Sequence, residues 1–229
     1  MSHGADFFYM DHDAFTGQYT GPVGPLVMSG DIEPGDYDRL LAKIGDDPRH
    51  FLAQGKLILA SSTGDANEAM KIGRFLKALH TEVSVGPLTG RCADACFLMY
   101  VAADQRGADG RGLIGIQGAA PADALAVREY LRENEVPTNL SERAMRPASG
   151  SVYWLNDIDE ASLNSRSPAF TRYLTLHCHW NDQVEREVRL GKRPFTDMKD
   201  MWACRSRITQ SDAAAALAAV LKTRPEARR

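Results

Sequence analysis

Between Pro25 and Gln117 the sequence alternates short apolar runs with segments whose apolar residues recur at helical spacing. This alternation constrains the fold most, because the runs have the length of buried strands and the segments between them can connect parallel strands. The pattern predicts strands over 26–28, 56–60, 82–85 and 113–116, with a helix after each of the first three. We therefore expect an α/β protein with a largely parallel sheet covered by helices.

After Pro121 the pattern becomes mostly helical. Helices are expected over 123–133, 141–145, 170–190 and 211–221. Residues 1–24 are rich in Gly, Asp and aromatic residues without a clear period, so no regular element is expected there.

This division predicts three regions within a chain of 229 residues, a length suited to one domain with a modest appendage. They are an N-terminal extension (1–24), an α/β core (25–165) and a helical C-terminal region (166–229).

Composition and charge exclude several classes of function. With 44% apolar and 25% charged residues the chain is an ordinary globular protein. A net charge of −3 offers no global attraction for nucleic acid or an anionic membrane, so no nucleic-acid partner is expected. The basic run from Lys222 to Arg229 is interpreted as a solvated terminus.

No segment is long enough to cross a membrane. The longest strongly apolar stretch, 95–103, falls far short of the roughly 20 residues that a spanning helix needs. The chain starts without a basic segment followed by an apolar one, so a cytoplasmic location is expected unless a signal peptide has been removed, in which case the location is periplasmic.

The four cysteines favour the periplasmic alternative. Cys92 with Cys96, and Cys178 with Cys204, would suit two disulfides in an oxidising compartment, although four buried thiols would leave the same sequence. The CxxxC spacing has no second matched Cys/His pair, so no structural zinc is expected.

Two strand-to-helix junctions carry the candidate chemistry, since ligands of open α/β sheets bind where strands end and helices begin. They read Ser-Ser-Thr-Gly-Asp-Ala-Asn-Glu-Ala (61–69) and Gly-Arg-Cys-Ala-Asp-Ala-Cys (90–96), followed by Gly-Ile-Gln (115–117).

In order and spacing these motifs resemble the Clp-protease/crotonase superfamily, particularly its small periplasmic Clp-like branch with S-P-G-G, C-x-S-A-C and I-G-x-H. The segments around 130–140 and 152–155 resemble that branch too, so the likeness covers roughly residues 26–175. The resemblance implies a Clp/crotonase-like spiral of β-α-β units that assembles as a trimer or a multiple of it.

Residue by residue, the resemblance argues against the family's chemistry. The serine nucleophile falls on Asp94, the histidine base on Gln117, and the second glycine of the oxyanion loop, after Gly64, on Asp65. Nucleophilic catalysis by this scheme needs a hydroxyl and an imidazole within hydrogen-bond reach, and a carboxylate repels a developing oxyanion.

Two interpretations of the aspartates are open. Each can be an N-terminal helix cap, and Asp65 followed by Glu68 resembles a capping box. Alternatively, Asp65 and Asp94 face one crevice, where they share a proton or bind a hard cation. Only two anionic ligands are visible, so we expect neither a metal site nor a cofactor, and Gln117 is interpreted as a hydrogen-bonded polar residue.

The remaining motifs are interpreted as parts of the scaffold without a function of their own. His177 and His179 are two residues apart, which places them on different faces of a helix. The Asp-His-Asp sequence at 11–13 is interpreted as a polar loop, and residues 107–112 as a polar turn before a strand.

The leading hypothesis is a catalytically degenerate Clp/crotonase-fold protein with a binding or assembly role and with a protein or peptide as partner. The alternative is an active hydrolase or acyl-processing enzyme that uses Asp65 and Asp94 without a serine. A third hypothesis is a structural subunit that pairs with an active paralogue. We expect a homo-oligomer with the apolar side of helix 170–190 at or near the interface, the alternative being that this helix folds back over its own core.

Overall fold

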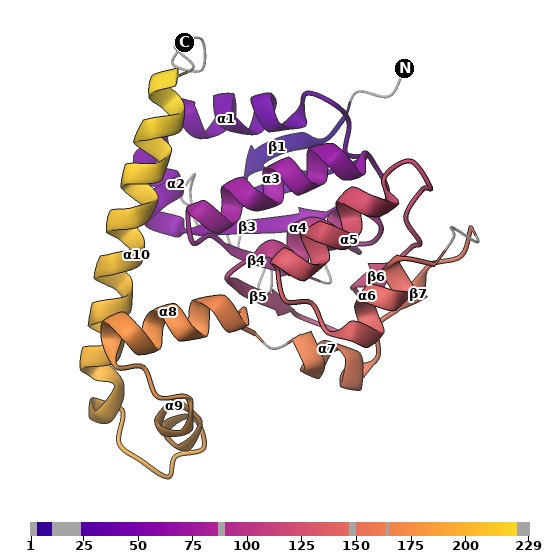
Figure 1. Cartoon of the computed structure of the whole chain (residues 1–229). Helices are drawn as coiled ribbons and strands as arrows, with labels where there is room; N and C mark the ends of the chain where they lie inside the picture. Colours follow the sequence, from indigo (N-terminus) through magenta and orange to yellow (C-terminus); the bar gives the residue numbers. More distant parts are fainter. Residues whose placement is uncertain (1–3, 11–23, 87–89, 147–149, 164, 224–229) are drawn as a thin grey trace.

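The computed structural model describes residues 4–10, 24–86, 90–146, 150–163 and 165–223. Its centre is a five-stranded sheet in the order β1-β2-β3-β4-β5 (Figure 1). The strands are β1 (Asp6–Tyr9), β2 (Leu26–Ser29), β3 (Lys56–Ala60), β4 (Glu82–Val85) and β5 (Gln105–Ala108). Strands β2 to β5 run parallel and β1 runs antiparallel to β2, so the expected α/β fold with a mostly parallel sheet is confirmed.

Helices precede, connect and follow these strands. Those of the core are α1 (Asp36–Asp46), α2 (Pro48–Gln54), α3 (Ala66–Ala78), α4 (Ala95–Ala102), α5 (Ala124–Glu133), α6 (Thr138–Ala144) and α7 (Asp157–Leu163). A separate two-stranded pair joins β6 (Gly115–Ile116) to β7 (Tyr153–Trp154). The helical C-terminal part consists of α8 (Pro168–Cys178), α9 (Asp182–Arg189) and α10 (Thr196–Thr223).

The core packs most tightly where α3 crosses α4. Every residue of α4 is buried, as its wholly apolar sequence predicts. A Cβ on Gly73 of α3 would lie 2.1 Å from the Tyr130 hydroxyl, which donates to the Leu98 carbonyl at 3.1 Å. The small residue therefore lets α3 approach α4 and α5.

The prediction of the fourth parallel strand is wrong. That strand is β5, whose last two residues fall in the stretch 107–112 interpreted as a polar turn, whereas the predicted 113–116 strand contributes β6 to the separate pair. The sequence of β5 does not look buried because it contains Arg106. The Arg106 guanidinium is nevertheless buried, and it donates to the carbonyls of Val101 at 2.7 Å and Leu163 at 2.5 Å.

Other element boundaries also differ. Strand β1 lies in the N-terminal segment where no element was expected, and its four residues are too few to show a period. Helix α1 ends at Asp46, before Pro48 as the sequence predicts, but the additional helix α2 begins at Pro48, because Asp47 caps it by accepting from the His50 amide. Helix α6 lies at 138–144 rather than 141–145.

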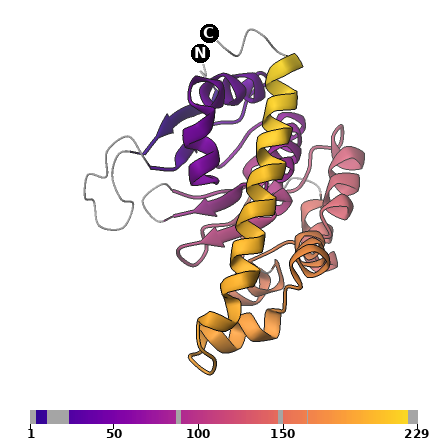
Figure 2. The ribbon, with the colours of Figure 1, turned by 90° about the vertical axis from the view of Figure 1, so that its left-hand side faces the viewer.

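The expected single helix over 170–190 is two helices. Helix α8 ends with His179 in the left-handed conformation, at φ 51°. Asn181 then caps α9 by accepting from the amides of Gln183 and Val184. The expected 211–221 helix is the end of α10, whose 28 residues run along one side of the core and past α8 (Figures 1 and 2).

The C-terminal helices have a small core of their own. Phe170, Leu174, Trp180 and Met198 form it, and Tyr173, Val184 and Val188 are among the side chains packed against it. Trp180 is only 3% exposed. Most of the apolar side expected to face a neighbouring subunit is therefore covered within the chain, and Leu176 on that side stays exposed.

Two disulfides are present. Cys178–Cys204 joins α8 to α10, and Cys92–Cys96 joins the turn before α4 to that helix. In the described part of the chain no helix is long and apolar enough to cross a membrane.

Candidate functional site

The turn before α3 is held by strand-like contacts to the segment that follows β2. The Ile32 amide donates to the Thr63 carbonyl at 3.2 Å, and the Asp65 amide donates to the Ile32 carbonyl at 2.8 Å. Between them Gly64 has φ 149°, and a Cβ there would lie 2.5 Å from the Ile32 carbonyl oxygen. This turn therefore requires glycine at position 64.

Asp65 caps α3, as the sequence predicts. Its backbone is extended and its Oδ1 accepts from the Glu68 amide at 2.7 Å. The capping box is only half formed, because Glu68 accepts from the amides of Gly35 at 3.2 Å and Tyr37 at 2.6 Å. Glu68 thus ties the start of α1 to α3.

The turn before α4 is built differently. The Cys92 amide donates to the Leu113 carbonyl at 2.8 Å, and the Ala93 amide donates to the Ser61 carbonyl at 3.0 Å. These bonds lock the segment before Asp94 between the two neighbouring chain segments. The Cys92–Cys96 disulfide links the residue two positions before Asp94 to the residue two positions after it.

Asp94 lies in a strained conformation at this turn, with φ 52° and ψ −122°. Side chains with a Cβ rarely adopt such a conformation, and it recurs where a turn from strand to helix exposes a reactive side chain. The cap expected at Asp94 is wrong, because its side chain makes no capping hydrogen bond to α4 in the described part of the chain.

The backbone of both turns nevertheless acts on the Asp94 carboxylate. Burial raises the pKa of this carboxyl, while hydrogen bonds from the backbone of Gly64 and Ala95 and from the Thr63 hydroxyl lower it, with a net shift upward from 3.8. The Thr63 hydroxyl lies 3.5 Å from Oδ2. Gly64 follows the end of β3 and Ala95 opens α4, so the carboxylate bridges the two junctions.

A cavity of about 290 Å³ lies beside these groups. The fold brings Asp65, Asp94 and Gln117 to its lining, so the three positions that depart from the family motif share one site. The apolar part of the wall includes Phe97, Leu98 and Val127.

Sequence reasoning missed Asp123, which also lines the cavity. Its Oδ1 accepts a hydrogen bond from the side-chain Nδ2 of Asn67 at 2.9 Å. This bond joins the start of α5 to the start of α3. Three carboxylates but no Lys, Arg or His line this cavity among the described residues. The only local signal for Asp123 in the sequence is its position at the start of a predicted helix.

A hydrolytic constellation is not assembled from the neighbouring serine. Ser61 is buried and its hydroxyl donates to the Thr63 carbonyl at 3.1 Å. The described residues contain no group of three or more His, Cys, Asp or Glu side chains that could hold a metal ion. The His177 ring packs at a tilt of 46° against Tyr173 in α8, His179 follows the helix, and residues 11–13 lie outside the described part.

Comparison with known proteins yields structural neighbours alone. The sequence matches no protein-family model and no curated protein. A membrane protease specific for a stomatin homologue, from Pyrococcus horikoshii, is 14% identical with a TM-score of 0.40, over 62% of this chain and 68% of that one. An enoyl-CoA hydratase from Mycobacterium ulcerans is 12% identical with a TM-score of 0.44, over 94% of both chains. Such distant similarity leaves the function of the cavity to be argued from its own residues.

Proposed function

We propose that this chain is a catalytically degenerate member of the Clp/crotonase superfamily whose crevice binds a ligand or partner without hydrolysing it. The observation that carries the proposal is the position of the Asp94 carboxylate. The resemblance puts Asp94 at the family's nucleophile position, and the backbone of Gly64 and of Ala95 lowers the pKa of its carboxyl against the larger effect of burial. Two amides that converge in this way would otherwise be free to stabilise an oxyanion.

The electrostatics of the crevice support a binding role. A carboxylate that occupies the amide pair excludes a substrate oxyanion from it, and Asp65 and Asp123 add negative charge to the same lining. Gln117 cannot remove a proton near neutral pH, so even a hydroxyl at position 94 would lack a base.

A second candidate function is acid–base catalysis by Asp94. Its favouring observations are the upward shift of the Asp94 pKa, caused by burial, and the strained backbone, since both are frequent at catalytic positions. In this alternative Asp94 would donate its proton to a substrate in the crevice, and Asp65 would remain the helix cap.

Turnover and labelling separate the two functions. The protein is screened against acyl esters, acyl thioesters and peptides, and is treated with a fluorophosphonate probe. The binding role predicts no turnover and no labelled serine. Turnover that disappears in Asp94→Asn and survives in Asp65→Asn would establish the acid–base alternative instead.

The double variant Asp94→Ser with Gln117→His tests the degeneracy from the other direction. It restores two motif positions and leaves Asp65 and the third triad position unchanged, so we expect little or no hydrolysis. Efficient turnover by this variant would mean that the scaffold retains the rest of the catalytic machinery.

The compartment and the assembly are also proposals. Two disulfides support an oxidising compartment, which the periplasmic hypothesis supplies. Exposed Leu176, Leu190 and Phe195 on the C-terminal helical unit support a homo-oligomer, proposed to be a trimer or a multiple of it. Thiol counting on denatured, unreduced protein tests the compartment, and four free thiols would refute it. Light scattering tests the assembly, and a monomeric mass would refute it.

A further inference from the structure

The charge of the molecule is divided between its two parts. Residues 1–165 contain 14 Lys and Arg against 23 Asp and Glu, whereas residues 166–229 contain 13 against 7. The C-terminal region is therefore net basic in a chain whose total charge is −3. Such an asymmetry indicates that the basic part meets an anionic partner or ligand.

Within this region a cavity of about 520 Å³ lies between α8 and α9. Its wall contains Arg166, Arg172, Arg186 and Arg189, with Asp182 and Glu185 as the carboxylates. Four guanidinium groups stand against two carboxylates in the lining, and Glu135 outside the lining pairs with Arg172, so one positive charge is left over. A bound anion would offset this charge.

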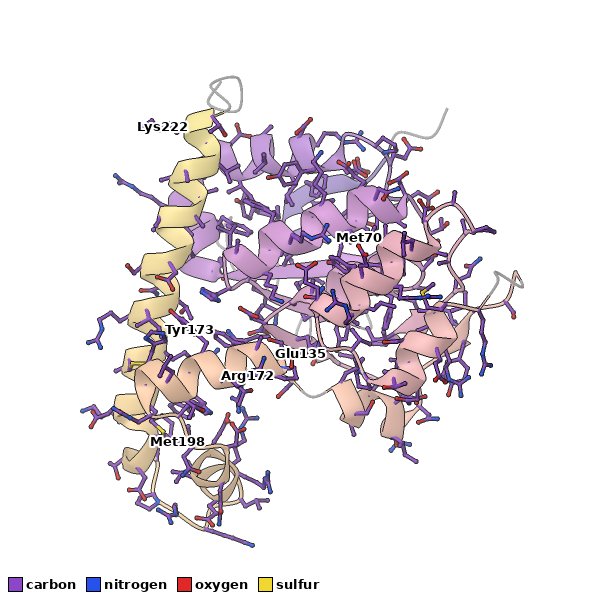
Figure 3. All side chains as sticks on the ribbon, in the orientation of Figure 1. Met70, Glu135, Arg172, Tyr173, Met198 and Lys222 are labelled. Atoms are coloured by element: carbon purple, nitrogen blue, oxygen red, sulfur yellow. A yellow bond between two sulfur atoms is a disulfide. The ribbon has the colours of Figure 1, made fainter. Side chains whose placement is uncertain are left out.

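Internal ion pairs use only part of this positive charge. Arg166 pairs with Asp182 at 2.7 Å and with Glu185, and Arg189 pairs with Glu185 at 2.7 Å. Arg172 pairs with Glu135 at 2.5 Å (Figure 3). Arg186 is exposed and has no ion pair among the described residues.

One hydrogen-bond donor of Arg166 is also unused. The Arg166 Nε is buried and has no hydrogen-bond partner in the described part of the chain. Burial lowers the pKa of nearby Arg205, and the charges of Arg166 and Arg189 also lower it, while Glu185 and Glu82 act in the opposite direction. The buried Arg166 N–H would gain a partner from a bound oxyanion.

The start of α8 adds to the site. Pro168 and Thr171 of its first turn belong to the cavity wall. The positive end of the helix dipole therefore acts on the same space as the arginines.

We propose that this arginine cavity, lined by residues of α8 and α9, binds inorganic phosphate or a phosphomonoester. The planar guanidinium fork matches two phosphate oxygens at once, which a single ammonium group does not. This site is separate from the Asp94 crevice, and its test is independent of whether that crevice is catalytic.

Calorimetric titration with inorganic phosphate at low ionic strength tests the proposal. We expect saturable binding that is weakened about tenfold or more in Arg186→Gln, because that arginine has no internal partner to retain. Arg207→Gln is the matched control, since Arg207 is an exposed arginine of α10 that does not line the cavity. Circular dichroism of both variants verifies that the fold is unchanged.

The source of the phosphate is separated by two further titrations. Binding of glycerol 3-phosphate without binding of vesicles that contain phosphatidic acid supports a small soluble ligand. Vesicle binding that is lost in Arg186→Gln supports a lipid headgroup. Absence of saturable phosphate binding, or an equal loss in Arg207→Gln and Arg186→Gln, would overturn the proposal.

Discussion

The turns that open α3 and α4 each place an aspartate before a helix, yet the two aspartates have opposite effects on the local backbone. Asp65 has an extended conformation and satisfies the Glu68 amide at 2.7 Å. Asp94 has φ 52°, makes no side-chain cap to its own helix in the described structure, and has the Thr63 hydroxyl 3.5 Å from its Oδ2. The first aspartate stabilises a helix, whereas the second holds a strained position at the wall of a cavity.

The difference teaches that the same residue type in equivalent topological places need not do the same work. A cap depends on contacts three residues apart, so it is a local property. The Asp94 conformation depends on Ser61, Leu113 and the Cys92–Cys96 disulfide, which hold its turn from three directions. Strain that persists because the surroundings enforce it is typical of a functional position.

The largest expected effect concerns the glycine that supports the first turn. In Gly64→Ala a new Cβ would lie 2.5 Å from the Ile32 carbonyl oxygen, so we expect the free energy of unfolding to fall by about 3 kcal/mol. Gly90→Ala is the matched control, since Gly90 also has a positive φ, of 104°, but no atom within 4 Å of the added Cβ. It should cost about 1 kcal/mol. Equal losses in urea denaturation would contradict the close contact at Gly64.

The cap at the first turn should have a smaller effect. Asp65→Ala removes the acceptor for the Glu68 amide, and we expect a loss of about 1 kcal/mol in the free energy of unfolding. Asp65→Asn keeps an acceptor oxygen and should be close to the parent protein. If both variants unfold at the parent urea midpoint, Asp65 does not cap α3.

Substitution of the aspartate by glycine should stabilise the protein at the second turn and destabilise it at the first. Asp94→Gly accepts the positive φ without a Cβ, so we expect a gain of about 1 kcal/mol at pH 7. Asp65→Gly should instead lower the free energy of unfolding by about 0.3 kcal/mol. A destabilised Asp94→Gly variant would show that the hydrogen bonds of the carboxylate outweigh the strain.

The smallest effect is the pH dependence that Asp94 confers. Because burial raises its pKa in the folded state, the stabilising contribution of the protonated form is present below its ordinary pKa of 3.8 and is lost as the pH rises through the folded-state value. The parent protein should therefore lose stability relative to Asp94→Asn as the pH increases over this range. Urea denaturation of both proteins at several pH values measures the difference, and a constant difference would remove the assigned shift.

The part of the fold that could be predicted is the part governed by local patterns. Strands β2, β3 and β4 are continuous apolar or alternating runs, and α4 is apolar throughout. Strand β5 escaped because its Arg106 looks exposed in sequence but is satisfied by carbonyls of α4 and α7. The break between α8 and α9 escaped because the apolar spacing continues across the Asn181 cap.

The candidate site was predictable in position but not in conformation. The motif order indicated Asp65, Asp94 and Gln117, and the structure places all three on one cavity. The strain at Asp94 and the approach of Asp123 arise from contacts between distant segments, which no local pattern records. The charge division between residues 1–165 and 166–229 was available from the sequence, but the arginine cavity depends on how α8 and α9 pack.

The central claim is that the Asp94 carboxylate occupies the amide pair of the two turns. Nuclear magnetic resonance of the Gly64 and Ala95 amide protons during a pH titration tests it most directly. We expect both signals to shift with one common midpoint above 3.8, and to lose this titration in Asp94→Asn while the Asp65→Asn variant retains it. Amide signals of Gly64 and Ala95 that do not titrate with Asp94 would contradict the claim and leave the pair free for an oxyanion.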